Sequence, residues 1–194
     1  MNSGYPLTIL GDSGFGGTYI LLIELAETIT LTFGRFQKGM RFTLPAGLYI
    51  YVGSALGQKG ASSLSYRLLR HVTRTGDKPP HIIRRALQNG LSTCGLPAPL
   101  PKRKTLRWHI DYLLDETAAS LVHVAAIRSS LRLESPIACW LMARDGVTVP
   151  IVGLGAQDTR GETHLLHLAH NGVWESVLKQ LPQFLDREMK KAAH

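Results

Sequence analysis

Alternating apolar and polar positions mark several short strands in the first third of the chain. Residues 17–25 and 28–33 are rich in β-branched and apolar side chains and flank a short polar turn, which predicts two consecutive strands. A third strand is predicted at residues 48–53, where apolar positions recur at every second residue. Its two faces are Leu48, Ile50 and Val52 on one side and Tyr49 and Tyr51 on the other. Together these segments predict a small meander.

Apolar positions spaced four apart mark helices further along the chain. Leu64, Leu68 and Val72 have this spacing and predict a helix over residues 61–75. The other predicted elements are, in order, a basic helix at 80–90, a short apolar element at 108–114, a strand at 120–128, a helix at 133–144, a strand at 164–168, and one or two helices at 173–190 that break near Pro182. This mixture predicts a fold of the α/β (α+β) class, with a central antiparallel sheet flanked by helices.

The length of 194 residues indicates one domain with appended segments. We expect a flexible glycine-rich lead over residues 1–16, a folded domain over 17–170 with a basic insertion near 76–107, and an amphipathic helical extension over 171–194. The lead contains a Gly-Asp-Ser-Gly run that is similar to the surroundings of a serine-protease nucleophile. So short a motif of common residues arises easily by chance, and only twelve residues precede Ser13, so we expect this serine to be inert.

The overall composition is that of an ordinary globular protein. Hydrophobic residues make up 44% and charged residues 19%, and no apolar run approaches the ~20 residues that a membrane span needs. The two cysteines, Cys94 and Cys139, lie far apart and in no metal-like spacing. This argues against a disulfide scaffold and favours a reducing compartment, so we expect a cytoplasmic protein without a membrane partner.

Positive charge is concentrated in one segment. The chain has a formal net charge of +8, and residues 67–107 hold ten of its 22 basic residues against one acid, Asp77. Such a cluster is either a solvated surface or a phosphate-binding one, and its concentration favours the second interpretation. The candidate nucleic-acid-binding residues are Arg70, Arg74, Arg84, Arg85, Lys102, Arg103, Lys104 and Arg107.

Two short motifs give this charge a chemical context. Gly17-Thr18-Tyr19 lies in one predicted strand and Tyr51-Val52-Gly53 in another, and a helical Arg67 and a later acid, Glu134, follow them. This order resembles the signature of the GIY-YIG nuclease superfamily. The spacing of 32 residues between the tyrosines is similar to that of its Uri-type endonuclease branch, long described as a domain of unknown function. The resemblance extends through the segments 46–57, 66–71, 108–114, 153–158 and 164–168.

The resemblance implies a GIY-YIG-like nuclease domain over residues 17–170, which hydrolyses phosphodiester bonds in DNA with Mg²⁺ or Mn²⁺. Glu134 would hold the cation through one carboxylate. The alternative is that this acid only interacts favourably with the N-terminus of its helix. Arg67 offers a planar fork for phosphate. Tyr19 or Tyr51 would be a general base only if nearby cations lowered its pKa, and His71, one turn after Arg67, is the alternative base.

Other polar residues near these motifs carry weaker indications. In an extended element, His109 and Asp111 would point the same way, and Asp111 would then orient His109; the alternative is that both are structural. The resemblance adds Asp158 as a supporting acid. It also shows departures: Ser54 stands where the superfamily often has a lysine, and Thr159 and Gly161 stand where relatives carry cysteines.

Three function classes are therefore open. The first is a metal-dependent endonuclease. The second is a catalytically silent nucleic-acid-binding module on the same fold. The third is a protein-interaction domain that docks through residues 173–190, although core packing explains that amphipathic pattern as well.

Overall fold

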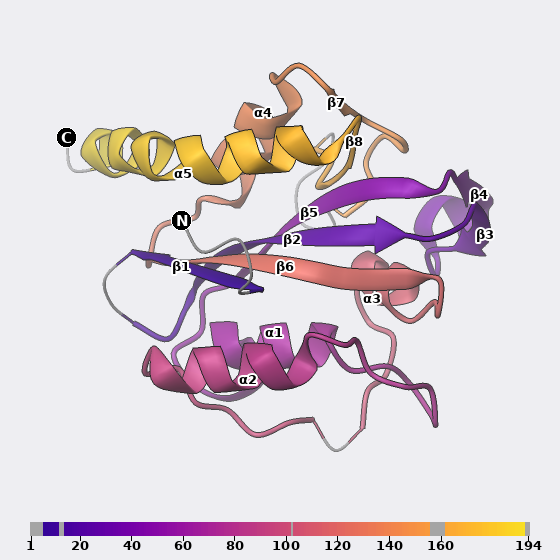
Figure 1. The fold of residues 1–194 in the computed structure, drawn as a ribbon, viewed down its shortest axis with the longest axis horizontal. Helices are drawn as coiled ribbons and strands as arrows, with labels where there is room; N and C mark the ends of the chain where they lie inside the picture. The colour runs from indigo at the N-terminus through magenta and orange to yellow at the C-terminus, as the bar shows by residue number, and fades with distance from the viewer. Residues whose placement is uncertain (1–5, 12–13, 102, 156–161, 193–194) are drawn as a thin grey trace.

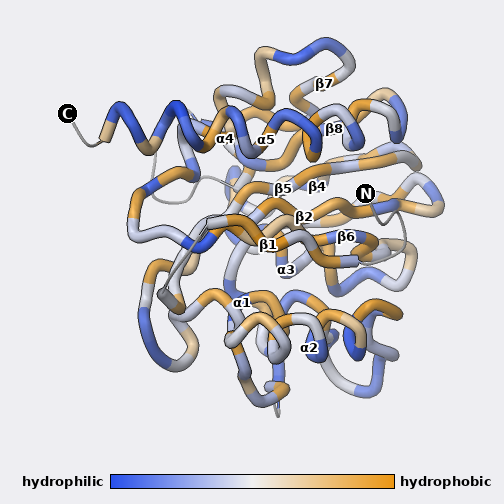
Figure 2. Tube along the Cα trace, turned by 60° about the vertical axis from the view of Figure 1, so that its left-hand side comes forward, coloured by the Kyte–Doolittle hydropathy of each residue, from blue (hydrophilic) through white to orange (hydrophobic). Residues whose placement is uncertain are grey.

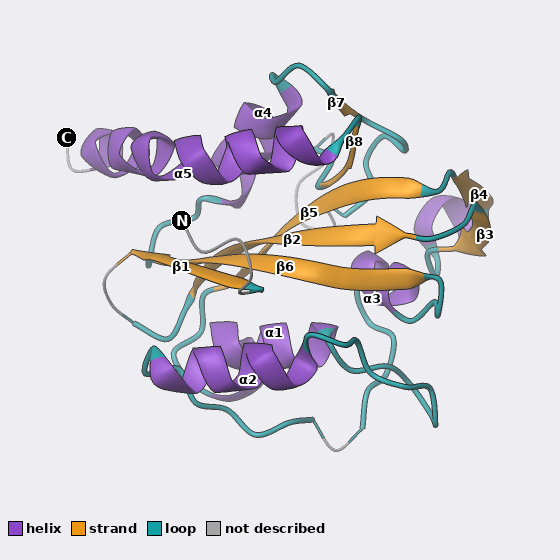
Figure 3. Ribbon diagram, viewed as in Figure 1, coloured by secondary structure: helices purple, strands orange, loops and turns teal. Residues whose placement is uncertain are grey.

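A six-stranded, mostly antiparallel sheet forms the centre of the protein (Figures 1 and 3). The computed structural model describes residues 6–11, 14–101, 103–155 and 162–192. In order across the sheet, the strands are β1 (Leu7–Gly11), β6 (Ala119–Arg128), β2 (Gly17–Leu25), β5 (Gly47–Ala55), β8 (Leu165–Leu168) and β7 (Val147–Thr148). The long strands β6, β2 and β5 pair antiparallel, as the sequence predicts, whereas β1 runs parallel to β6.

Helices cover both faces of this sheet (Figure 1). One face carries α1 (Leu64–His71), α2 (Arg84–Thr93) and α3 (His109–Leu114), and the other carries α4 (Glu134–Met142) and α5 (Asn171–Ala192). The strands between them form an apolar band in Figure 2. The predicted mixed α/β fold, with a mostly antiparallel central sheet and helices on both of its faces, is thereby confirmed.

The alternation predicted for residues 48–53 divides the core in two. Tyr49 and Tyr51 belong to the core cluster under α1, α2 and α3. Ile50 and Val52 belong to the cluster under α4 and α5. Because β5 lies inside the sheet and both of its faces are covered, residues on either face are buried. The alternation therefore predicted correctly which face of β5 each of these side chains occupies.

The predicted meander is only partly correct. Strand β3 (Ile29–Thr32) does not pair with β2 but with β4 (Arg41–Leu44), and the two form a separate small sheet. Strand β2 pairs instead with β5 over its whole length, from Gly17 opposite Ala55 to Leu25 opposite Gly47. The β3–β4 hairpin is thus an excursion between the two strands that carry the tyrosine motifs.

The structure corrects the predicted N-terminal lead. The glycines predict a flexible segment over residues 1–16, but Leu7–Gly11 form strand β1, which extends the sheet beyond β6. Leu7 is buried and Ile9 packs against the core, so apolar burial fixes this segment despite the glycines that follow it. Ser13 lies outside the described residues.

The structure settles two segments whose form the sequence left open. Residues 109–114, predicted only as part of a short apolar element, form helix α3, whose core positions are Ile110, Leu113 and Leu114. The C-terminal extension is one helix, α5, and Pro182 lies inside it on the exposed side. Buried side chains before and after Pro182 hold both halves of α5 on the sheet. Across the described ranges, every helix is too short or too polar to pass through a lipid bilayer.

Candidate active site

The two motif tyrosines lie on neighbouring strands and on the same face of the sheet. Tyr19 comes from β2 and Tyr51 from β5, and their ring centroids are 6.4 Å apart. Gly53 pairs directly with Tyr19 across the two strands. A Cβ atom at Gly53 would lie 2.5 Å from the Tyr19 hydroxyl oxygen, so only glycine lets the ring lie over β5 at this point.

Tyr19 is hydrogen-bonded to His71, the last residue of α1. The Tyr19 hydroxyl lies 2.8 Å from Nε2 of His71, and both side chains are buried. Burial raises the pKa of Tyr19 far above its usual value. Burial, reinforced by the positive charges of Lys104 and Arg67, holds the pKa of His71 well below its usual value. Both groups are therefore neutral near pH 7, and the phenol is assigned as the donor to an unprotonated Nε2.

The other ring nitrogen of His71 faces a buried carboxylate. Nδ1 of His71 lies 3.9 Å from Oδ1 of Asp111, which is too long for a direct hydrogen bond but close enough to favour the proton on Nδ1. Asp111 is fixed by other contacts: its Oδ2 accepts from Arg70 at 2.6 Å and from the backbone N–H groups of Arg107 and Trp108, both at 2.9 Å. Asp111 thus places a negative charge near His71 while its side chain caps the start of α3.

Arg67 lies between the tyrosines and the surface. Its guanidinium stacks on the ring of Trp108, 3.7 Å from the centroid, and Arg70 approaches the same ring at 4.8 Å. The positive charge of Arg67 opposes the rise that burial imposes on the pKa of Tyr19. Because an aromatic ring rather than a carboxylate holds Arg67 in place, its N–H groups are not committed to an acid within the described residues.

Glu134 stands opposite the tyrosines at the first position of α4. Its Oε2 accepts a hydrogen bond from the Ser54 hydroxyl, and its Oε1 lies 3.0 Å from Nδ1 of His164. The Glu134 side chain is 26% exposed, so the carboxylate reaches solvent. Its negative charge reinforces the burial that raises the pKa of Tyr19 and of Tyr51.

His164 joins two carboxylates. Its Nδ1 lies 3.0 Å from Glu134, and its Nε2 lies 3.0 Å from Oε2 of Glu162. Burial disfavours the protonated ring, but the two acids outweigh burial and raise the pKa of His164 above its usual value. The Ser135 hydroxyl donates to the same Oε2 of Glu162 at 2.6 Å. A protonated His164 therefore ties Glu134 to Glu162.

The residues around Glu134 fit a hard divalent cation. A carboxylate and a hydroxyl, from Glu134 and Ser54, are the oxygen donors that Mg²⁺ and Mn²⁺ prefer, and Mg²⁺ usually keeps several waters and takes only one or two carboxylates. No group of three or more histidine, cysteine or acidic side chains suited to a metal occurs among the described residues. The arrangement thus fits one carboxylate with water and phosphate oxygens, and not a closed zinc site.

Asp111 does not orient His109, which was one of the two alternatives that the sequence left open for this pair. On a helix, residues two apart do not share a face, and Asp111 turns to His71 while Nδ1 of His109 accepts from the backbone N–H of Gly155 at 3.3 Å. Burial lowers the pKa of His109, so its ring is neutral near pH 7. The third predicted supporting residue, Asp158, lies outside the described residues.

Comparison with known proteins assigns the chain to a family. The chain matches the family model described as a domain of unknown function, DUF123, over residues 18–186. The chain belongs to the DUF123 family. No curated protein matches the chain, and neither does any solved structure. The family description names neither fold nor activity, so the resemblance to GIY-YIG nucleases, the metal and the DNA partner stay predictions.

The matched DUF123 range contains all of the candidate catalytic residues. Tyr19, Tyr51, Arg67, His71 and Glu134 come from β2, β5, α1 and α4, and the structure brings them together at one end of the β2–β5 pair. Sequence reasoning assigned no catalytic role to three residues that contact them. Ser54 and His164 hold Glu134, and Trp108 holds Arg67. Each had a sequence signal, because Ser54 directly follows the second motif and the other two begin the segments 164–168 and 108–114 of the resemblance.

The basic segment of the DUF123 domain separates into buried and exposed members. Arg74 was predicted to bind nucleic acid, but it is buried and donates to the carbonyl oxygens of Pro79 and Ala119, both at 2.6 Å. Lys104 is also buried, 3.8 Å from Asp111, and burial lowers its pKa to about 8. These two cations hold the insertion on the sheet and are not available to a phosphate, which corrects the prediction.

The other basic side chains of the segment differ in their exposure. Arg70 is held by Asp111 and by the carbonyl of Thr105 and is mostly covered. Lys102 lies outside the described residues. The remaining candidates, fully or partly exposed, are Arg84, Arg85, Arg103 and Arg107.

Proposed function

We propose that this DUF123 protein is a metal-dependent endonuclease that hydrolyses phosphodiester bonds in DNA. One observation carries the proposal: a buried Tyr19–His71 hydrogen bond lies beside the guanidinium of Arg67 and close to the partly exposed carboxylate of Glu134. Phosphodiester hydrolysis needs a proton acceptor for the attacking water, positive charge on the phosphoryl oxygens and support for the leaving oxygen. These residues supply each of the three.

The proton is proposed to move along the Tyr19–His71 pair. A full transfer from Tyr19 to His71 before attack is unfavourable, because burial makes the phenol a weak acid and the imidazole a weak base. We therefore propose a concerted transfer, in which the water proton reaches the Tyr19 oxygen as the Tyr19 proton moves to Nε2 of His71. The resulting imidazolium would be stabilised by the Asp111 carboxylate, 3.9 Å from Nδ1.

Charge on the phosphate would be balanced from two sides. The Arg67 guanidinium, positioned by its stacking on Trp108, would donate to two phosphoryl oxygens. Glu134, with Ser54 beside it, would hold Mg²⁺ or Mn²⁺, which supplies Lewis-acid stabilisation of the leaving oxygen. The exposed arginines of the basic segment, among them Arg85 and Arg103, would bind the DNA backbone outside the site.

A second candidate is a nucleic-acid-binding module without catalysis. The observation that favours it is the engagement of both Glu134 oxygens, one by Ser54 and one by His164, which a cation would have to displace in part. The two candidates separate in one experiment. Labelled single- and double-stranded DNA and RNA are incubated with the protein and Mg²⁺, Mn²⁺ or a chelator, and both cleavage and binding are measured. Metal-dependent cleavage supports the nuclease; binding that is salt-sensitive but never followed by cleavage supports the silent module.

A further inference from the structure

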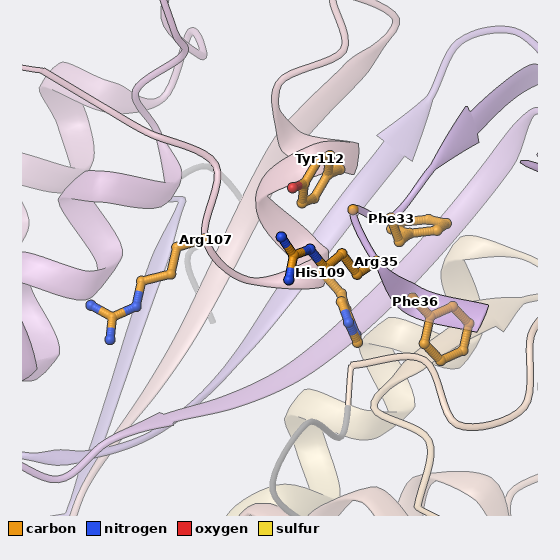
Figure 4. Close-up of a pocket in the computed structure, with 7 residues that line it drawn as sticks. Phe33, Arg35, Phe36, Arg107, His109 and Tyr112 are labelled. Carbon is orange, nitrogen blue, oxygen red and sulfur yellow. The ribbon is translucent and has the colours of Figure 1, made fainter. Parts of the chain in front are cut away.

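A pocket of about 430 Å³ opens beside the candidate active site (Figure 4). It lies between the turn that follows β3 and helix α3, so two segments about 75 residues apart in the chain build it. Its volume falls in the range of small-molecule sites, roughly 300–1,000 Å³. The lining residues are Phe33, Gly34, Arg35, Phe36, Arg107, His109 and Tyr112.

The walls of the pocket are aromatic and closely fitted. Phe36 meets His109 edge to face with ring centroids 5.0 Å apart. Gly34 has a positive φ of 62°, and a Cβ atom there would lie 2.7 Å from the Tyr112 hydroxyl, so the turn must carry glycine for Tyr112 to approach. The next turn residues, Gln37 and Lys38, also have positive φ, a strained arrangement that is concentrated in proteins at binding sites.

The two arginines of the pocket are cationic donors, and the Tyr112 hydroxyl can both donate and accept. Figure 4 shows the Arg35 guanidinium between His109 and Tyr112, whereas the side chain of Arg107 reaches away from them. Because Nδ1 of His109 accepts from Gly155 and the ring is neutral, its Nε2 carries the proton. None of the described lining residues is acidic. The complementary ligand is a flat, apolar ring system with several hydrogen-bond acceptors and a negative charge, which describes a nucleotide.

The pocket also adjoins the site. Phe33 and His109 line this pocket and also a small void that Tyr51 lines. Phe33 and His109 thus connect the pocket to one of the two motif tyrosines. We propose that the pocket binds one unpaired nucleobase of the DNA strand, with its phosphate on Arg35. This inference rests on the proposed function, because it assigns a substrate feature to the same site.

The test measures binding without metal, so that it does not depend on cleavage. Titration of the full chain with deoxyadenosine 5′-monophosphate, followed by NMR, should shift the resonances of His109 and Tyr112. Arg35→Ala and Phe36→Leu should each weaken this binding, the first by removing the charge and the second by removing the ring at similar volume. Arg41→Ala, an exposed arginine on the adjacent strand β4, is the matched control and should bind as the wild type does.

Inorganic phosphate and deoxyadenosine are the comparison ligands, and both should bind more weakly than the nucleotide. A single-stranded oligonucleotide with one abasic position placed in the pocket should bind about 5–150-fold more weakly than the intact strand. Phosphate binding as tight as the nucleotide, or Phe36→Leu binding like the wild type, would overturn the base assignment. If the protein binds nucleotides here but never cleaves DNA, the proposed function fails and the pocket stands. If it cleaves DNA and neither Arg35→Ala nor Phe36→Leu changes that cleavage, the proposed function stands and the pocket assignment fails.

Discussion

Two histidines serve the candidate site from opposite sides, and their surroundings give them opposite properties. His71 is enclosed beneath the sheet with a phenol and several cations, and its pKa lies well below the usual value. His164 lies between the carboxylates of Glu134 and Glu162, and its pKa lies above the usual value. The same side chain is therefore a neutral proton acceptor in one place and a cationic clamp in the other. Neighbouring charge and burial, not residue type, decide the role.

The comparison divides the site into a buried half and an open half. The buried half consists of Tyr19, His71 and Asp111, whose side chains are almost completely covered by the rest of the protein. The open half consists of Ser54, Glu134 and His164, and the Glu134 side chain is partly exposed. We expect proton transfer to depend on the buried half and metal binding on the open half. Each prediction below changes one half and asks whether the other responds.

The largest effect is expected in the buried half, from His71→Gln. If Nε2 of His71 accepts the Tyr19 proton, its loss should lower the cleavage rate by ~10²–10⁴. Metal affinity should stay at the wild-type value, because Glu134 is untouched. Single-turnover cleavage and Mn²⁺ binding are the measurements, with His170→Gln at an exposed position as control. Circular dichroism establishes that the variant folds, and a folded variant that cleaves at the wild-type rate removes His71 from the mechanism.

In the open half, Glu134→Gln should lower the cleavage rate by ~10²–10³, or about 2.7–4 kcal/mol of transition-state stabilisation. The amide keeps the shape but removes the charge that attracts the cation, so the Mg²⁺ needed for half-maximal rate should rise. DNA binding should survive or tighten, because one source of repulsion is gone. Glu175→Gln on the exposed side of α5 is the control. If Glu134 serves only its helix, the rate is unchanged and the protein loses about 0.3–1 kcal/mol of stability.

The basic segment contains both exposed and buried cations. Substitution of the exposed ones should have a smaller effect than the two substitutions above, and should act on DNA binding. Arg85→Ala and Arg103→Ala remove exposed charges, and each should reduce the slope of log affinity against log salt by ~0.9 on duplex DNA or ~0.7 on single strands. Arg187→Ala, exposed on α5, should leave the slope unchanged. Arg74→Ala is expected to lower the melting temperature instead, because it leaves buried carbonyl groups unpaired. An Arg85→Ala, Arg103→Ala double variant with the wild-type slope would mean that DNA does not lie on this surface.

The sequence predicted those features that depend on nearby residues. The alternation in residues 48–53 was sufficient to assign these side chains to the two faces of β5, because both faces are covered. The glycine of the second motif lies where the Tyr19 ring leaves no room for a Cβ atom. Spacing on one helix likewise placed Arg67 and His71 on α1.

Features that depend on distant partners were not predictable in this way. Ser54 meets Glu134 across 80 residues, and strand β1 finds β6 more than 100 residues later. Arg74 was taken for a surface charge because its carbonyl partner Ala119 lies 45 residues away. The six residues of α3 are too few to distinguish a helical from an extended period, and this is why the sequence left a pairing of Asp111 with His109 open.

The smallest effect, and the most direct test of the comparison, is the pH dependence of the two histidines in the metal-free protein. For His164 the folded pKa is raised, so its contribution to stability is complete below the unfolded value of about 6.5 and is lost as pH rises through the folded pKa. For His71 the folded pKa is lowered, so the neutral ring is favoured above about 6.5 and stability falls as pH drops below that value.

The melting-temperature difference between wild type and His164→Gln should therefore be larger at about pH 6 than at about pH 8, whereas any difference caused by His71→Gln should grow in the opposite direction. NMR titration assigns the effect to each ring: His164 should titrate above the usual histidine range, and His71 should stay neutral through the accessible range. The Glu162→Gln variant sharpens the test, because it removes one of the two acids and should lower the pKa of His164 without moving His71. Parallel titration of both rings would mean that the two halves of the site share one electrostatic environment, and the division between a proton-transfer half and a metal-binding half would fail.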